Sequence, residues 1–146
     1  MIALIQRVQH AHIHVKKTEI ATIHKGILAF IGIERKDTPL QADKLVKRLL
    51  DYRIFADEKG KMNLSLQNIN GDLLLVPQFT LAATTDKGLR PSFTSAASPD
   101  LGRQLFDYLC DQAFQLHSHV QTGQFGADMQ VSLINDGPVT FWLQTK

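Results

Sequence analysis

Four consecutive apolar residues, Leu73–Val76, follow an Asn-Gly turn signal and precede Pro77. An uninterrupted apolar run of this length is typical of a strand buried on both faces, and such a strand needs packed layers on either side. Pro77 has no N–H group to donate to a sheet ladder, so we expect the strand to end or bulge there. The length suits one domain, and we expect residues 1–146 to fold as a single unit.

The first third of the chain predicts further strands. Four segments there are apolar, alternating or β-branched: Ala3–Val8, His10–Val15, Ile20–Ile23 and Ile27–Ile33. Lys25-Gly26 marks a turn before the last of them. We therefore expect a meander of three or four strands.

Two helices interrupt the strands. Thr38 can cap the first, Pro39 suits its first position, and Gln41 completes a capping box. Apolar residues then recur at helical spacing to about Tyr52. The second helix should open at Ser98–Asp100, where Pro99 again follows a capping residue.

The remaining segments predict closing strands and one long loop. Strands are expected at Val120, Val131–Ile134 and Val139–Leu143, with a tight turn at Asn135–Pro138 between the last two. Thr84–Ala97 is rich in Thr, Ser, Gly and Pro, and a loop this long is often functional. The order of elements predicts one α/β domain with a substantial sheet and two main helices.

Charge and composition exclude several classes of protein. The net charge of +2 excludes a strongly polycationic nucleic-acid binder, although residues 1–61 carry twelve cations against seven anions and residues 62–146 carry four against seven. Such a basic region can contact a few phosphates or simply face solvent. No apolar run is long enough to cross a membrane and no secretion signal is evident, so we expect a cytoplasmic protein without membrane contact.

The histidines suggest a metal site at first sight. His10, His12 and His14 alternate and would share one face of a strand, and His117 and His119 repeat the pattern. Three imidazoles can hold zinc, which would make the protein a metal-dependent hydrolase. Ligands at this spacing diverge on a flat strand, however, and no acidic residue is near, so solvent-facing positions are the better interpretation. We expect neither metal nor cofactor.

Other catalytic signatures are missing. Cys110, the single cysteine, lies on the apolar stripe of the second helix without a basic residue within a turn, which favours a buried, inert thiol. The chain contains no nucleophile-elbow motif, no phosphate-binding loop and no dinucleotide fingerprint. An enzyme with this sequence must therefore use backbone groups, hydroxyls or its own substrate.

Three segments differ from ordinary connections. Pro77–Leu81 would place the Gln78 amide and the Thr80 hydroxyl at the carboxyl end of the buried strand, a common place for a site. Gly88–Phe93 sets one cation beside an aromatic ring, and Asn135–Thr140 contains Gly before Pro, which leaves the glycine carbonyl free to accept. A polar strand exit, a plain loop and a hairpin connection are the alternatives.

Together these segments resemble a known family. In order and spacing the chain carries QRV at 6–8, GKMN at 60–63, QFTL at 78–81, RPSF at 90–93, FGADM at 125–129 and NDGPVT at 135–140. This combination is similar to D-aminoacyl-tRNA deacylase, the D-tyrosyl-tRNA deacylase family, from Met1 to Thr145. One departure is Pro77, where the family usually has serine before QFTL.

The resemblance implies a compact fold of β/β/α layers with a barrel-like sheet. It also implies a homodimeric hydrolase that cuts the ester between a D-amino acid and tRNA without a cofactor. Its site residues would be Gln78, Phe79 and Thr80 around the terminal adenosine and the scissile ester, Phe125 and Met129 lining the pocket, and Arg7 anchoring Gly137 and Pro138. The Gly137–Pro138 peptide would be cis and would reach into the partner's site as a wall against L-amino acids.

Aminoacyl esters need little help to hydrolyse. The ribose 2′-OH lies beside the carbonyl, so an enzyme need only place water and stabilise the oxyanion, here with N–H groups near Phe79 and Thr80. Thr80 as the nucleophile is the alternative. A rigid backbone wall excludes one configuration because the side chain of that amino acid would overlap it sterically. Glycine has no side chain, so we expect glycyl esters to be accepted. Because of Pro77, a module that binds tRNA ends without chemistry remains open.

Overall fold

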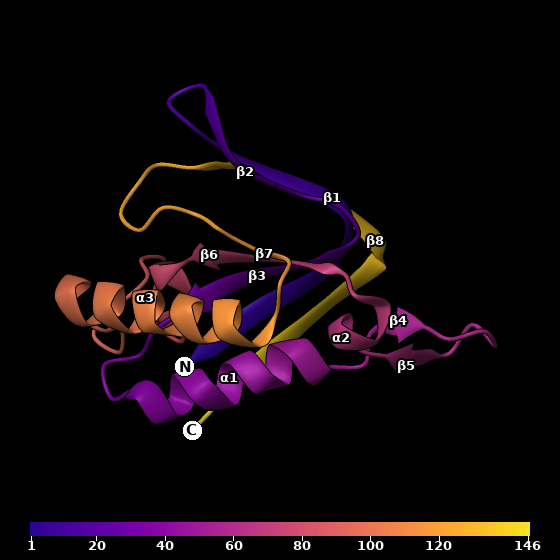
Figure 1. The fold of residues 1–146 in the computed structure, drawn as a ribbon. Helices are drawn as coiled ribbons and strands as arrows, with labels where there is room; N and C mark the ends of the chain where they lie inside the picture. Colours follow the sequence, from indigo (N-terminus) through magenta and orange to yellow (C-terminus); the bar gives the residue numbers. More distant parts are fainter.

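The structure is a computed structural model that describes residues 1–146. Its strands are β1 (Ile2–Val15), β2 (Thr18–Ile23), β3 (Gly26–Gly32), β4 (Phe55–Ala56), β5 (Met62–Leu64), β6 (Asp72–Pro77), β7 (Val120–Thr122) and β8 (Gln130–Gln144). Its helices are α1 (Pro39–Asp51), α2 (Leu66–Ile69), the 3₁₀ helix η1 (Phe79–Ala82) and α3 (Pro99–Leu116). Figure 1 shows these elements along the chain.

The 14-residue strand β1 organises the main sheet. Its first half pairs with β3 on one edge and its second half pairs with β2 on the same edge, both antiparallel. Along its whole length the other edge of β1 pairs with β8. The sheet continues from β3 through parallel pairs to β6 and β7. This arrangement bends the sheet strongly and makes it barrel-like, as expected.

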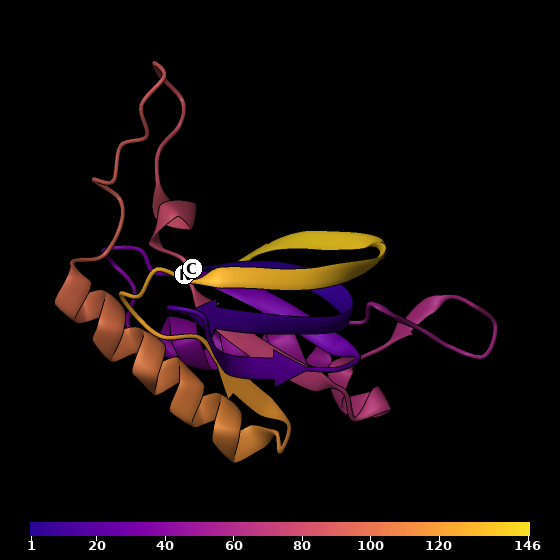
Figure 2. The same ribbon diagram turned by 90° about the horizontal axis from the view of Figure 1, so that it is seen from above.

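Two apolar cores lie on the two faces of β3 and β6. The larger core, of 25 buried residues, packs the sheet against α1 and α3. The smaller, of 8 buried residues, fills the space between β3 and β6 and the curled half of the sheet made by β1 and β2. Leu73 and Leu75 face the first core, whereas Leu74 and Val76 face the second, so β6 is buried on both faces. The β/β/α layering is thereby confirmed (Figure 2).

Local signals in the sequence account for the helices and for the end of β6. The Thr38 N–H donates to Gln41 Oε1 at 2.9 Å, one half of the capping box at the start of α1. Ser98 Oγ accepts from Leu101 N at the start of α3. Pro77 is the last residue of β6, as expected of a residue that cannot donate to the ladder. The long loop is also present, and it projects from the body of the molecule after η1 (Figure 2).

Two strand predictions are wrong. Ala3–Val8 and His10–Val15 are parts of the single strand β1, because no turn residue separates them. The predicted tight turn at Asn135–Pro138 does not join a hairpin. The segments on either side belong to the bent strand β8, and both pair with β1 instead of each other. Between the pairs Gln6–Thr140 and Val8–Asn135 the longer stretch of β8 is accommodated as a bulge.

The smaller elements extend from this body. β4 and β5 form a separate two-stranded hairpin that projects from the sheet (Figure 2). No helix combines the length and apolarity that crossing a membrane requires.

Candidate active site

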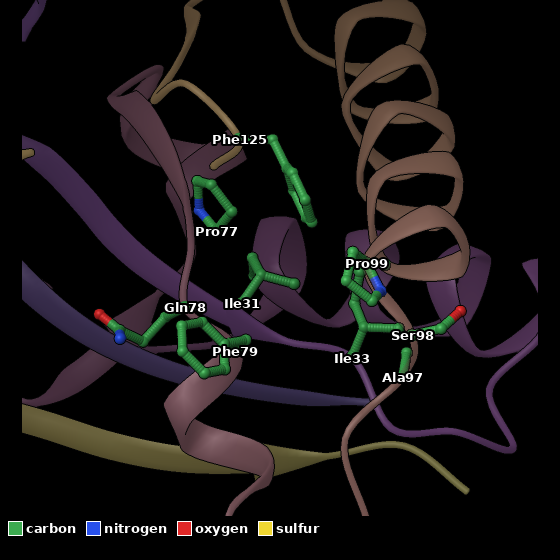
Figure 3. Close-up of a pocket in the computed structure, with 10 residues that line it drawn as sticks. Ile31, Ile33, Pro77, Gln78, Phe79, Ala97, Ser98, Pro99 and Phe125 are labelled. Carbon is green, nitrogen blue, oxygen red and sulfur yellow. The ribbon is translucent and has the colours of Figure 1, made fainter. Parts of the chain in front are cut away.

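A pocket opens where β6 ends and η1 begins. Its volume is about 210 Å³, and its lining includes the predicted residues Gln78, Phe79 and Phe125. Figure 3 shows Phe125 and Pro77 on one side of this pocket and Ile33, Ala97 and Pro99 near the start of α3. The walls are mostly apolar, so few side chains here can form hydrogen bonds with a polar group of a ligand.

A second pocket of about 310 Å³ adjoins the first. Pro77, Gln78, Phe79 and Phe125 line both, and Met129 lines only the second. The structure therefore brings together four of the predicted residues from the end of β6 and the segment before β8. None of the residues that line these two pockets is titratable.

Backbone pairing places Gln78 and Thr80. The Gln78 N–H donates to the Ile31 carbonyl at 2.8 Å and thereby extends the β3–β6 ladder by one bond. The chain then turns into η1, whose first internal bond runs from Leu81 N to the Gln78 carbonyl at 3.2 Å. The Gln78 amide nitrogen donates to Thr80 Oγ1, so Thr80 is held beside the pocket through Gln78.

The ring of Phe79 stands largely free. Its side chain is 62% exposed, and its ring centroid lies 5.2 Å from that of Phe93 in the projecting loop. The RPSF segment thus adds a second aromatic ring at the rim of the pocket. A flat ligand group can stack on such a surface.

Phe125 is positioned by residues that the sequence analysis missed. Gly102 on α3 leaves the space for its ring, because a Cβ at that position would lie 3.3 Å from Phe125 Cζ. The Arg103 guanidinium lies 4.9 Å from the ring centroid, and Phe106 packs at 6.3 Å. A glycine on the helix face that carries the apolar stripe was the available signal.

The bulge in β8 forms a second group of predicted residues. The Gly137–Pro138 peptide is cis, and both residues are exposed. Arg7 Nε donates to the Asp136 carbonyl at 2.9 Å, and Arg7 Nη1 donates to the Ile54 carbonyl at 2.7 Å. Arg7 therefore ties the bulge to the base of the β4–β5 hairpin.

Asn135 holds the bulge from inside, a role that the sequence analysis also missed. Its Oδ1 accepts from Val139 N at 2.9 Å, and its Nδ2 donates to Thr140 Oγ1 at 2.8 Å. The two bonds span the Gly137–Pro138 peptide. An asparagine just before Asp-Gly-Pro is typical of such side-chain bonds to nearby backbone.

These two groups lie apart within one chain. Ile31 pairs with Pro77 beside the pocket, whereas Arg7, which holds the bulge, pairs with Ile27. Ile27 and Ile31 are four positions apart on β3, which is about 13 Å along the strand. Figure 1 shows the bend of β8 at the end of the sheet opposite to the end of β6.

The other candidates stand apart from both groups. The His10, His12 and His14 rings follow one another along β1 at centroid spacings of 6.3 and 5.4 Å. Across the chain, no three histidine, cysteine or acidic side chains gather in a way that could hold a metal ion. Cys110 is buried, and burial together with Asp107 and Asp111 raises the pKa of its thiol to about 12. The predicted burial of this thiol is thereby confirmed.

The chain resembles proteins of one named group along its length. Residues 4–144 match the family model described as D-Tyr-tRNA(Tyr) deacylase. A D-aminoacyl-tRNA deacylase of Herminiimonas arsenicoxydans is 59% identical over 100% of this chain and 98% of its own. One of Pseudomonas fluorescens (strain Pf0-1) is 56% identical over 99% of this chain and 100% of its own.

Solved structures agree with the fold. One, titled c-Myc DNA Unwinding Element Binding Protein, superposes with a TM-score of 0.96 at 34% identity and covers 100% of this chain and 99% of that one. Another, titled as a probable eukaryotic D-amino acid tRNA deacylase, superposes with a TM-score of 0.83 at 19% identity over 99% of this chain and 98% of that one. On the family match and the curated relatives, this chain belongs to the D-Tyr-tRNA(Tyr) deacylase family.

Proposed function

We propose that this protein hydrolyses the ester of D-aminoacyl-tRNA and releases tRNA and the free D-amino acid. Family membership and the curated relatives' name support this activity. The observation that carries the mechanism is a pocket without titratable side chains, placed beside an exposed aromatic ring and a 3₁₀ helix start. Such a pocket suits an ester that is already activated. The substrate would be found in the cytoplasm.

The proposed chemistry uses the backbone of η1. The N–H groups of Phe79 and Thr80 precede the first internal hydrogen bond of that helix, so the helix itself offers them no acceptor. They are the proposed donors to the oxyanion that forms when water attacks the carbonyl. The ribose 2′-OH of the substrate lies beside that carbonyl and would orient the water. The Thr80 hydroxyl accepts a hydrogen bond from the Gln78 amide and has no base beside it, so the proposal does not use it as the nucleophile.

The proposed selectivity comes from a second copy of the chain. Within one subunit the Gly137–Pro138 bulge and the Gln78–Thr80 pocket lie at opposite ends of the sheet. In a symmetric dimer each bulge would instead face the partner's pocket. The bulge would then exclude an L side chain by overlap, whereas a D side chain or glycine would fit. Ile134 and Trp142, 46% and 53% exposed on β8, offer apolar surface for such a dimer.

The direct test is release of amino acid from matched substrates. D-aminoacyl-tRNA, L-aminoacyl-tRNA and glycyl-tRNA are compared on the same tRNA at equal enzyme concentration. We expect hydrolysis of the D and glycyl esters and rejection of the L ester. Equal rates on the D and L esters would contradict the proposed wall, and no release from any of them would contradict the activity.

Mixed dimers test whether the bulge acts across subunits. Gln78→Trp fills space in the two pockets that Gln78 lines, and Gly137→Ala displaces the bulge, so each variant alone should be inactive. When the two are unfolded and refolded together, half of the dimers are mixed and each has one intact site if the bulge acts in trans. We therefore expect about a quarter of wild-type activity. No recovery would place both parts in the same subunit.

A nucleic-acid binder without chemistry is the second candidate. It is favoured by Pro77 in the position where a serine is expected and by the name of the 34% identical structure, which describes a DNA-binding protein. Binding of uncharged tRNA and of duplex DNA, measured beside the deacylation assay, separates the two. Tight binding with no ester cleavage would favour this second candidate.

A further inference from the structure

A third depression adjoins the second pocket. This depression has a volume of about 690 Å³ and lies between the segments His14–Lys17 and Gln124–Gln130, and we call it the lysine groove. Gly126 and Ala127 line both the lysine groove and the pocket that holds Met129. The two depressions therefore adjoin at Gly126 and Ala127, so a ligand longer than the pocket can reach both.

The lysine groove differs from the pocket in its chemistry. Lys16 and Lys17 supply two cations and Asp128 supplies one anion. The other polar side chains that line the groove are those of His14, Gln124 and Gln130. The pocket itself is mostly apolar and has no charge. A ligand bound across both would need an uncharged end and a charged continuation.

The two lysines are held at the tip of the β1–β2 hairpin. They form its turn, with Val15 paired to Thr18 on either side. Their φ angles of 48° and 68° are in the left-handed region, where asparagine and glycine are the usual residues of such a turn. Both lysines are exposed and neither forms an ion pair, so their charges are available to a ligand.

The groove is kept in place by strand pairing. His14 pairs with Gln130 at the start of β8, which joins the hairpin to the segment that carries Phe125 and Met129. Figure 1 shows the hairpin tip and the segment entering β8 on the same side of the sheet, away from α1. The distance between the lysines and the pocket is therefore set by the sheet.

We infer that the lysine groove binds the phosphates of the single-stranded 3′ segment of an RNA whose last nucleotide occupies the pocket. A terminal nucleoside presents an uncharged, stackable end, and every nucleotide before it adds one negative charge. This order matches the uncharged pocket and the two unpaired lysines next to it. The identity of the RNA rests on the proposed function, whereas the binding of its phosphates does not require catalysis.

The test measures RNA binding as a function of salt. The probe is a fluorescent RNA hairpin with a single-stranded 3′ extension of four nucleotides, bound to wild type and to Lys16→Gln/Lys17→Gln. Each phosphate neutralised on a single strand contributes about 0.7 to the slope of log K against log salt. We expect the variant to lose about 1.4 of that slope, so that from 50 to 200 mM salt the wild type loses about sevenfold more affinity than the variant.

The control is Lys36→Gln/Lys47→Gln. It removes the same charge at exposed positions before and on α1, on the far side of the sheet. The control should keep the wild-type slope, and a hairpin without the 3′ extension should bind wild type and both variants alike. An unchanged slope in Lys16→Gln/Lys17→Gln, or an equal loss in the control, would overturn the inference.

Deacylation is measured on the same proteins as a separate readout. The quantity compared is the ratio of kcat/KM for D-aminoacyl-tRNA to kcat/KM for D-aminoacyl-adenosine, which lacks the preceding phosphates. This ratio should fall in Lys16→Gln/Lys17→Gln, and loss of folded enzyme would not change it. A wild type that binds the RNA with the expected slope but cleaves neither ester would contradict the proposed function and leave the phosphate site supported.

Discussion

Arg7 Nε lies 2.9 Å from the main-chain carbonyl of Asp136, the residue that precedes Gly137–Pro138. The guanidinium also donates to the Ile54 carbonyl, and its side chain is only 14% exposed. One side chain therefore fixes the bulge of β8 against the chain that follows α1. The proposed orientation of the bulge depends on this contact together with the two hydrogen bonds of Asn135.

Arg7→Ala should reduce chiral selectivity more than it reduces the rate on the D ester. It removes two hydrogen bonds from a charged donor, each of about 1.5–3 kcal/mol, and leaves the bulge free to move. Because 1.4 kcal/mol corresponds to a factor of ten, we expect the D-to-L rate ratio to fall by about tenfold or more. The control is Arg48→Ala, which loses a bond to the Gln144 carbonyl at the other end of β8. An unchanged ratio in Arg7→Ala would contradict the anchoring role.

Gly137→Ala should abolish activity on D-aminoacyl-tRNA, because a displaced bulge would obstruct the partner's pocket that it faces in the proposed dimer. A Cβ there would lie 2.6 Å from Val139 Cγ2 and 3.2 Å from Arg7 Nη2, so the bulge must shift. The φ of +142° is also rarely adopted by a residue with a side chain. Gly60→Ala is the matched control, since it has φ +76° but no atom within 4 Å of the new Cβ. Full activity in Gly137→Ala would show that the shape of the bulge is not critical.

The fold was more predictable from sequence than the site. Helix α1 begins at Pro39 after a capping residue, and β6 ends at Pro77, because both signals act within a few residues. The bulge at Asn135–Pro138 could not be distinguished from a hairpin turn on local grounds. Its geometry depends on β1, which pairs with the chain on both sides of it and is more than a hundred residues away.

In the site, too, the features set by local sequence could be predicted, whereas those set by tertiary packing could not. Gln78 and Phe79 could be predicted because they follow a buried strand, and family motifs drew attention to Phe125 and Met129. Gly102 gave a signal as a glycine on the apolar stripe of α3, but its role could not be predicted, since its lack of a side chain matters only when α3 packs beside Phe125. That Arg7 reaches both Asp136 and Ile54 likewise depends on tertiary packing.

Cys110 should remain unreactive in the folded protein. Burial, with Asp107 and Asp111 nearby, raises its pKa from 9.0 to about 12, so at pH 8 about a thousandfold less thiolate is present than in the unfolded chain. We expect a thiol reagent such as DTNB to label it only after unfolding, and Cys110→Ala to keep wild-type activity. Rapid labelling of the active native enzyme would contradict this prediction.

The same thiol should make stability depend on alkaline pH. A folded pKa above the unfolded one means that the folded state keeps its proton longer, so this contribution is complete below pH 9 and is lost as pH rises toward 12. We expect the free energy of unfolding to decline more steeply over this range in wild type than in Cys110→Ala. Denaturant titrations at several pH values measure it, and parallel curves would argue against it.

Thr80→Val should keep most of the deacylase activity. The proposed mechanism uses the Thr80 N–H, which this substitution preserves, and it leaves attack to water. We expect kcat within about tenfold of wild type, whereas loss of a true nucleophile reduces kcat by about 10⁶ in a serine protease. Thr80→Ser serves as the control that retains the hydroxyl. A loss of many orders of magnitude in Thr80→Val alone would assign the nucleophile to Thr80.

Phe79→Ala should weaken substrate binding more than catalysis. The ring is 62% exposed beside the pocket and lies 5.2 Å from Phe93, which leaves a face for the terminal base. Stacking of a base on an aromatic side chain contributes about 1–3 kcal/mol, so we expect KM to rise by about tenfold or more with a smaller change in kcat. Phe114→Ala is the matched control, because Phe114 is 52% exposed on α3 and lines neither pocket. Steady-state kinetics on D-aminoacyl-tRNA separate the two constants. If Phe79→Ala instead lowers kcat at unchanged KM, the ring acts on the position of the ester in the transition state and not on the base.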